Sequence, residues 1–186
     1  SLVLAVAVAF TATAATFPEQ SVSAAEQTVY SDDMESAADG WSVAWTNETA
    51  GTESRAVNEW AVNNTTTWWS FTSSAEQNVT ISRTVESVST GSYSLSVDVG
   101  GGNASGTISV TVGDTPYSKS IVLGAWDEFE KNTVEGIEVA SDDTDIKIEL
   151  SVQMLAEGWF DLDNIVLSKS VSDGEDKAEK VAALNS

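Results

Sequence analysis

The chain has 186 residues, of which 41% are hydrophobic and 8% aromatic, and this length suits one domain with a single sizeable core. Its 29 acidic residues against 8 basic ones give a formal net charge of −21, which argues against nucleic acids and anionic membranes as partners and leaves neutral ligands open. The sequence contains neither cysteine nor histidine, which excludes disulfides, zinc clusters and a Ser-His-Asp triad. Any catalysis would have to rest on carboxylates.

The chain begins with an apolar stretch that resembles the later part of a secretory signal. Residues 2–15 are rich in Ala and Val, and Ser23-Ala24-Ala25 supplies small residues at the expected cleavage position. The stretch is too short for a permanent transmembrane helix. We therefore assign residues 1–25 to a signal peptide remnant and expect no membrane contact after its removal. Export combined with a cysteine-free chain favours a secreted or cell-surface bacterial protein.

From Thr28 onward, apolar and polar residues alternate with the period of two that is typical of half-buried β-strands. The clearest alternations span residues 78–86, 92–99, 107–112 and 145–154. Weaker strands are expected at residues 41–46, 55–62, 67–72, 118–123 and 133–139. The run Gly100-Gly101-Gly102-Asn103 separates two clear alternations and therefore predicts a turn.

About ten short strands without an amphipathic helix predict an all-β fold, a two-sheet antiparallel β-sandwich with jelly-roll topology. We expect this sandwich to occupy residues 28–168. The polar and charged residues 169–186 predict a linker towards a further domain, with a short helix near its end.

The closing strand, expected at residues 159–167, changes the phase of its alternation in the middle. Its first apolar pair, Phe160 and Leu162, and its last pair, Ile165 and Leu167, have opposite parity, which predicts a bulge between them. Two interpretations stay open. The carboxylates at the bulge hold a structural Ca²⁺, which needs only oxygen ligands, or they are solvated at a sheet edge.

Seven tryptophans exceed the needs of so small a core. Each one alone is more often a core residue, yet an exposed indole suits the apolar face of a pyranose ring when amide and carboxylate groups lie nearby. Trp68 and Trp69 are adjacent, so on a strand one should lie in the core and the other at the surface. The polar neighbours that would complete a sugar site are Arg55, Asn58, Glu59, Asn63 and Asn64.

A carboxylate-only hydrolase or lyase is a rival hypothesis. A glycosidase needs two carboxyl groups about 5 to 10 Å apart, one of them with a raised pKa. Most acidic residues of this chain fall at outward positions of the expected strands or in turns such as residues 142–145. A solvated surface therefore explains them better than a catalytic pair.

Four segments carry a family resemblance: Met34-Glu35 with Asp39-Gly40-Trp41, residues 91–97, residues 126–129 with 134–139, and the closing residues 162–167. Through them, residues 31–167 resemble a secreted carbohydrate-binding module of the galactose-binding-like β-sandwich type. The segments around Trp126 and Trp159 are most similar to the β-1,4-galactan-binding family sixty-one modules of bacterial arabinogalactan endo-β-1,4-galactanases.

The resemblance implies a structural Ca²⁺ that joins the first and last strands, with Glu35 and Asp163 at the matching ligand positions. The chain departs from the family pattern at Asn164, where a second Asp is common. The residues that we expect to contact the sugar are Trp69, Trp159, Trp60, Trp68, Arg55 and Asn63.

We therefore predict non-catalytic binding of β-1,4-galactan or a related plant polysaccharide. The chain would be a monomeric module tethered to a glycoside hydrolase, which it targets to its substrate. The alternative is a cell-surface adhesion or assembly module that binds protein and presents a flat apolar patch instead of an aromatic cleft.

Overall fold

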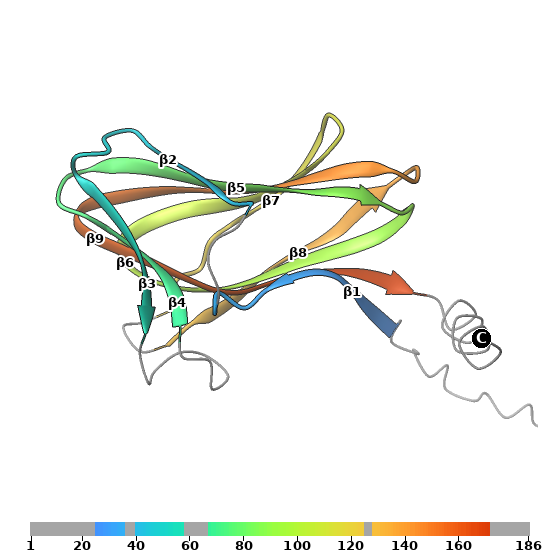
Figure 1. The fold of residues 1–186 in the computed structure, drawn as a ribbon, viewed down its shortest axis with the longest axis horizontal. Coiled ribbons are helices and arrows are strands. Elements are labelled where there is room, and N and C mark those ends of the chain that lie inside the picture. The colour runs from blue at the N-terminus through green and yellow to red at the C-terminus, as the bar shows by residue number, and fades with distance from the viewer. Residues whose placement is uncertain (1–24, 36–39, 58–66, 125–127, 172–186) are drawn as a thin grey trace, which may run out of the picture.

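The alternating segments form strands throughout the described chain. The computed structural model describes residues 25–35, 40–57, 67–124 and 128–171, with the backbone alone described at 55–57 and 67–68. No helix in these ranges is long and apolar enough to cross a membrane. The regular elements of the described residues are nine strands (Figure 1): β1 (Ala25–Asp32), β2 (Ser42–Trp45), β3 (Gly51–Val57), β4 (Thr67–Ser73), β5 (Gln77–Val88), β6 (Gly91–Val112), β7 (Thr115–Ser120), β8 (Glu130–Val139) and β9 (Thr144–Val171).

Two long strands, β6 and β9, pass from one layer of the molecule to the other. Residues 144–154 of β9 and 104–112 of β6 belong to sheet I, whose strand order is β2–β5–β9–β6–β7. Residues 158–171 of β9 and 91–102 of β6 belong to sheet II, whose order is β3–β4–β9–β6–β8, with β1 paired to the end of β9. These strand pairs are all antiparallel, and the two layers face each other in Figure 1. The predicted all-β, two-sheet sandwich with jelly-roll topology is confirmed.

The glycine run in β6 does not form the predicted turn. The strand continues from Gly91 to Val112, and Gly100–Gly102 pair with residues 159–161 of β9. The register shifts just after Gly102, where Asn103 adopts a φ of 51°. The turn prediction is wrong because this bulge bends the strand from sheet II into sheet I while the pairing with β9 resumes on the other side.

The second crossing, in β9, also depends on an unusual backbone. Glu157 has a φ of 59°, and Gly158 follows it. A side chain at Gly158 would come within 2.8 Å of the carbonyl oxygens of Asn103 and Leu155, so this position requires glycine. The two crossings therefore lie against each other.

The core fills the space between the sheets and follows the predicted alternation. Sheet I contributes Ile108, Val110, Ile146, Ile148, Leu150, Val152 and Met154. Sheet II contributes Tyr93, Leu95, Val97, Val99, Phe160, Leu162, Ile165 and Leu167. Burying one such side chain stabilises a fold by about 1.5–3 kcal/mol. Because Phe160 and Leu162 point inward, Trp159 and Asp161 point to the outer face of sheet II.

The phase change predicted for the closing strand is confirmed. On β6, Ser96 pairs with Val166 and Asp98 pairs with Asp163, so two residues of β9 stand opposite one residue of β6. Asn164 lies inside this bulge and adopts a φ of 46°.

Strand pairing extends slightly beyond the expected domain limits. Ala25 pairs with Val171, whereas the sandwich was expected at residues 28–168. Residues 1–24 and 172–186, which carry most of the expected leader and linker, lie outside the described residues.

Candidate functional site

Trp159 is a half-buried ring on the outer face of sheet II. The antiparallel register places Thr72 of β4 on one side of it and Gly102 of β6 on the other. A Cβ atom at Gly102 would lie 2.6 Å from the indole Nε1, so the ring lies over the bare backbone of this glycine. Glycine at this position makes the room that the ring occupies.

A hollow of about 360 Å³ opens beside this ring. Thr72, Ser73, Ser74 and Glu157 share the lining with the indole. Ser73 is buried and its hydroxyl is engaged with the Ala75 carbonyl and the Gln77 side-chain amide, so the exposed side chains of Thr72, Ser74 and Glu157 supply the accessible polar groups. The ring offers an apolar face, and the polar groups offer directional hydrogen bonds. A pyranose ring requires this combination, because its C–H face is apolar while its rim is hydroxylated.

Acidic side chains continue the outer face of sheet II away from Trp159. Asp161 is half-buried two residues further along β9. Asp163 and its register partner on β6, Asp98, are 0% and 3% exposed. Along this face the side chains therefore change from the accessible ring of Trp159 to the carboxylates of Asp163 and Asp98, which are too deeply buried for a large ligand to reach.

The charge of Asp98 is disfavoured by its surroundings. Burial raises the pKa of this carboxyl group above its usual value of 3.8, while Lys131 and the side chain of Asn164 oppose the shift. Lys131 Nζ lies 3.9 Å from Asp98 Oδ1, but the lysine side chain is 62% exposed, so solvent screens the pair. Burial is the larger effect.

Of the predicted calcium ligands, Glu35 lies three residues beyond the end of β1 and is exposed, whereas Asp163 lies beside the bulge of β9 and is buried. Asp163 Oδ1 accepts a hydrogen bond from the Asn164 N–H at 2.8 Å. Pairing of β1 with β9 ends at Asp32 and Ile165, two residues along β9 from Asp163, and the chain then turns at Met34, which has a φ of 60°. Ca²⁺ takes roughly six to eight oxygen ligands. Among the described residues no three acidic side chains group to hold a metal, so an ion would also need carbonyl or water oxygens.

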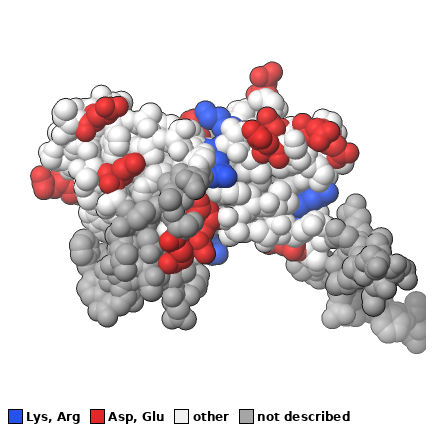
Figure 2. Space-filling view, in the orientation of Figure 1, with Lys and Arg blue, Asp and Glu red and all other residues white. Residues whose placement is uncertain are grey.

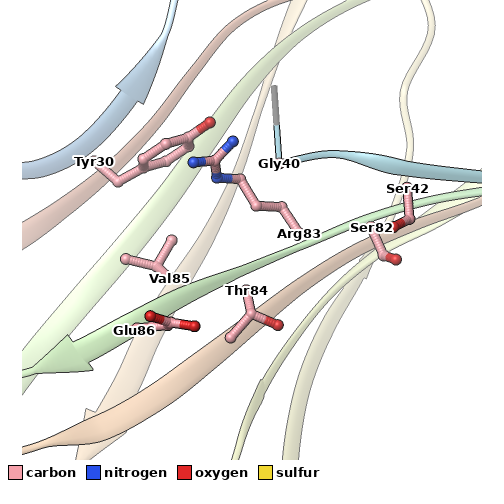
Figure 3. A pocket seen from close by; sticks show the side chains of 8 residues that line it. All are labelled: Tyr30, Gly40, Ser42, Ser82, Arg83, Thr84, Val85 and Glu86. Atoms are coloured by element: carbon pink, nitrogen blue, oxygen red, sulfur yellow. The ribbon is translucent and has the colours of Figure 1, made fainter. Parts of the chain in front are cut away.

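A larger groove of about 530 Å³ lies at the edge of sheet I, where β2 begins beside β5 (Figure 3). The Arg83 guanidinium lies 4.6 Å from the centre of the Tyr30 ring. Asp32 Oδ2 accepts hydrogen bonds from Trp41 Nε1 at 3.0 Å and from the Tyr30 hydroxyl at 3.3 Å. Burial, and after it Asp32, raises the pKa of Tyr30 to about 12. Arg83 covers a face of this ring, so the groove suits sugar stacking less well than the hollow beside Trp159.

Among the other described tryptophans, Trp69 is buried in the core, whereas Trp41 and Trp45 are half-buried and pack against it. Trp69 is 3% exposed, with its ring centroid 6.2 Å from that of Trp41 and 4.9 Å from that of Phe71. The ring centroid of Trp45 lies 6.0 Å from that of Phe71. The expected sugar contact at Trp69 is wrong, because inward parity on β4 buries the ring beside Phe71. That one ring of the Trp68 and Trp69 pair lies in the core is confirmed.

The remaining predicted sugar contacts are only partly described. Arg55 and Trp68 lie on β3 and β4 at positions where the backbone alone is described. Trp60 and Asn63 lie outside the described residues. Trp159 pairs with β4 near the end of the β3–β4 hairpin that is opposite to residues 58–66.

Four lining residues of the hollow were not marked by any sequence pattern: Thr72, Ser73, Ser74 and Glu157. They belong to β4, to the residues that follow it and to the crossing of β9, which are distant in sequence. Only the register of β4 against β9 brings them together. The outward parity of Trp159 relative to Phe160 was the one local signal for this site.

No family model matches the chain, and no curated protein matches it in sequence. Solved structures do match. TmCBM61 in complex with β-1,4-galactotriose has a TM-score of 0.61 and 20% identity, and the match covers 71% of this chain and 90% of that chain. The family 11 carbohydrate-binding module from Clostridium thermocellum, in complex with a β-1,3-1,4-mixed-linked tetrasaccharide, has a TM-score of 0.51 and 12% identity over 79% of this chain and 97% of that chain.

The chain has the β-sandwich fold of carbohydrate-binding modules. The resemblance expected from the sequence is thereby confirmed at the level of the fold. This chain also matches part of a larger protein, the enzymatically active domain of bacteriophage CBA120 tailspike protein 4, with a TM-score of 0.56 and 11% identity over 69% of this chain and 19% of that chain. Because one fold serves several proteins, function is argued from the residues of the site.

Proposed function

We propose that this chain is a non-catalytic carbohydrate-binding module that holds β-1,4-galactan or a related plant polysaccharide in the hollow beside Trp159. The observation that carries the proposal is the indole ring seated over Gly102, with the Thr72 hydroxyl and the Glu157 carboxylate lining the same hollow. A sugar would stack its C–H face on the ring and share its hydroxyls with these groups. The galactotriose bound by TmCBM61 makes galactan the first ligand to test.

The proposed affinity is modest. A hollow of about 360 Å³ that contains one ring offers few fully desolvated contacts, so we expect a Kd between about 1 μM and 1 mM. Such a module serves a tethered glycoside hydrolase by raising the local concentration of its substrate.

The carboxylates of sheet II support binding over catalysis. A glycosidase requires a pair of carboxyl groups that both reach the scissile bond, one with a raised pKa. Asp98 has a raised pKa and faces Asp163 across the strands, but both side chains are almost completely buried. A polysaccharide has no access to this pair.

The protein-binding alternative predicted a flat apolar patch. Among the described residues, the exposed large apolar side chains are Val29, Val122 and Leu155. They lie on β1, on the connection between β7 and β8, and at the crossing of β9. Scattered apolar residues of this kind are normal for a soluble surface and do not favour adhesion to a protein.

The proposal is tested by retention in an affinity gel that contains galactan, with xylan and β-glucan gels run in parallel. Trp159→Ala should weaken retention on the preferred glycan about tenfold or more, whereas Trp159→Phe should keep part of it because a ring remains. Val122→Ala, which removes exposed apolar surface elsewhere, is the matched control. Equal retention of Trp159→Ala and Val122→Ala, with both variants folded, would overturn the assignment of this site.

We further propose a structural Ca²⁺ with Glu35 and Asp163 as its carboxylate ligands. An ion there would tie the residues after β1 to the bulge of β9 and stabilise the sandwich. Chelation should lower the thermal unfolding midpoint of the wild type by several degrees, and Asp163→Ala should no longer respond to added calcium. Wild-type midpoints that are the same with calcium and with chelator would contradict this part of the proposal.

A further inference from the structure

The outer face of sheet I, on the other side of the sandwich from Trp159, carries an uncharged groove of about 560 Å³. It crosses the sheet from β5 over β9 and β6 to the end of β7. The described residues that line it include no charged side chain, although the chain contains 29 acidic residues. Hydroxyl and amide side chains make up its polar lining: Asn78, Thr80, Ser105, Thr107, Ser120, Ser151 and Gln153.

The strand register arranges these polar groups in rows. Thr80 pairs with Ser151, Ser151 with Thr107, and Thr107 with Ser120, so four hydroxyl side chains stand side by side across four strands. The adjacent row consists of Asn78, Gln153 and Ser105. Neighbouring strands lie about 4.8 Å apart, and successive rows on one face lie about 6.7 Å apart. The groove floor is therefore a regular array of hydrogen-bonding groups.

Charged side chains appear at the borders of this array and are engaged there. Glu149 lies in the row next to Ser151, and its Oε2 accepts a hydrogen bond from Lys147 Nζ at 2.6 Å. Glu76 Oε1 accepts a hydrogen bond from Gln153 Nε2 at 3.2 Å at the edge. A polyanion would be repelled by a chain of net charge −21, and a polycation would find no carboxylate in the groove itself. A neutral, hydroxyl-rich chain matches the groove.

We propose that this groove is a second carbohydrate site, which takes an extended segment of neutral polysaccharide laid across the strands. The strand spacing is comparable to the length of one pyranose unit, so consecutive sugars would meet equivalent hydroxyl groups on consecutive strands. The ligand class rests on the proposed function, whereas the position of this site does not. Two sites on opposite faces make the module bivalent, so that it cross-links soluble polysaccharide chains.

The test combines affinity electrophoresis with light scattering of high-molecular-mass galactan. Thr107→Arg fills the groove with a long cation. Thr111→Arg is the matched control, because it introduces the same side chain at an outward, half-buried position of β6 that does not line the groove. Ser120→Arg, at an exposed position in the four-hydroxyl row, is a second groove variant should Thr107→Arg fail to fold.

We expect the wild type and Thr111→Arg to raise the scattering of galactan, and Thr107→Arg to lose most of that rise while it keeps retention that depends on Trp159. The double variant Thr107→Arg with Trp159→Ala should bind at least about fivefold more weakly than Trp159→Ala alone. If folded groove variants scatter like the wild type and the double variant binds like Trp159→Ala, the second site is wrong and the first site stands. If the wild type is retained by none of galactan, xylan and β-glucan, the proposed function and this inference both fall.

Discussion

At the scale of residues, the proposed sugar site depends on a pair, Trp159 and Gly102. The ring can lie along the outer face of sheet II because its neighbour on β6 has no side chain. Any larger residue at Gly102 would push the ring out of the position in which it lines the hollow. Further along the same face lie the buried carboxylates of Asp98 and Asp163, where the burial of charge affects stability.

Asp98 is expected to cost stability at neutral pH. Because burial raises its pKa in the folded state, the folded protein binds this proton more tightly than the unfolded chain does. The protonated Asp98 side chain therefore makes its full contribution to the stability of the fold below the usual pKa of 3.8. That contribution is lost as the pH rises through the higher pKa of the folded state.

Asp98→Asn removes the titration, so it should unfold at higher urea concentration than the wild type at pH 7. The advantage should shrink as the pH is lowered towards 4. Urea unfolding curves across this range measure it. A constant difference at every pH would show that burial does not shift the pKa of Asp98 as described.

At the scale of elements, the alternation of side chains predicted most strands and most of the core, but not the buried side chains of Met34, Trp69 and Phe71. It did not foretell that β6 and β9 each run through both sheets. Gly100–Gly102 interrupt the alternation and look like a turn, yet their hydrogen bonds to β9 continue. Whether a strand continues through such a stretch depends on its pairing with residues that are distant in sequence. The alternation within a single strand gives no information about that pairing.

The same limit applied to the site. The family resemblance selected Trp159, and parity showed that Trp68 and Trp69 point to opposite faces, but it could not tell which of the two is buried. That depends on Trp69 lying opposite Leu162 and beside Phe71, a tertiary contact. The sequence also did not predict the hydroxyl groups around Trp159, because the pairing of β4 with β9 brings them there.

The backbone conformation at the bulge of β9 leads to a further prediction. Asn164 has a φ of 46°, in the left-handed region that asparagine and glycine tolerate and β-branched residues avoid. Asn164→Val should lower the free energy of unfolding by about 1–2 kcal/mol relative to Asn164→Gly. Denaturant unfolding measures the difference. Equal stability of the two variants would mean that position 164 is not held in this conformation.

At the scale of the whole molecule, charge and shape point to neutral polymers. The visible face carries many acidic side chains separated by broad uncharged areas (Figure 2). A sandwich presents two outer faces, and here one bears an accessible ring while the other bears a hydroxyl array. Both arrangements suit a ligand that is rich in hydroxyl groups and free of charge.

The indole N–H signals in a heteronuclear NMR spectrum test the central claim most directly. The chain has seven tryptophans, and the signal that vanishes in Trp159→Ala identifies Trp159. On titration with β-1,4-galacto-oligosaccharide, we expect this signal to shift most, while the buried ring of Trp69 stays nearly unchanged. A titration that leaves the Trp159 signal in place while other indole signals move would contradict the account.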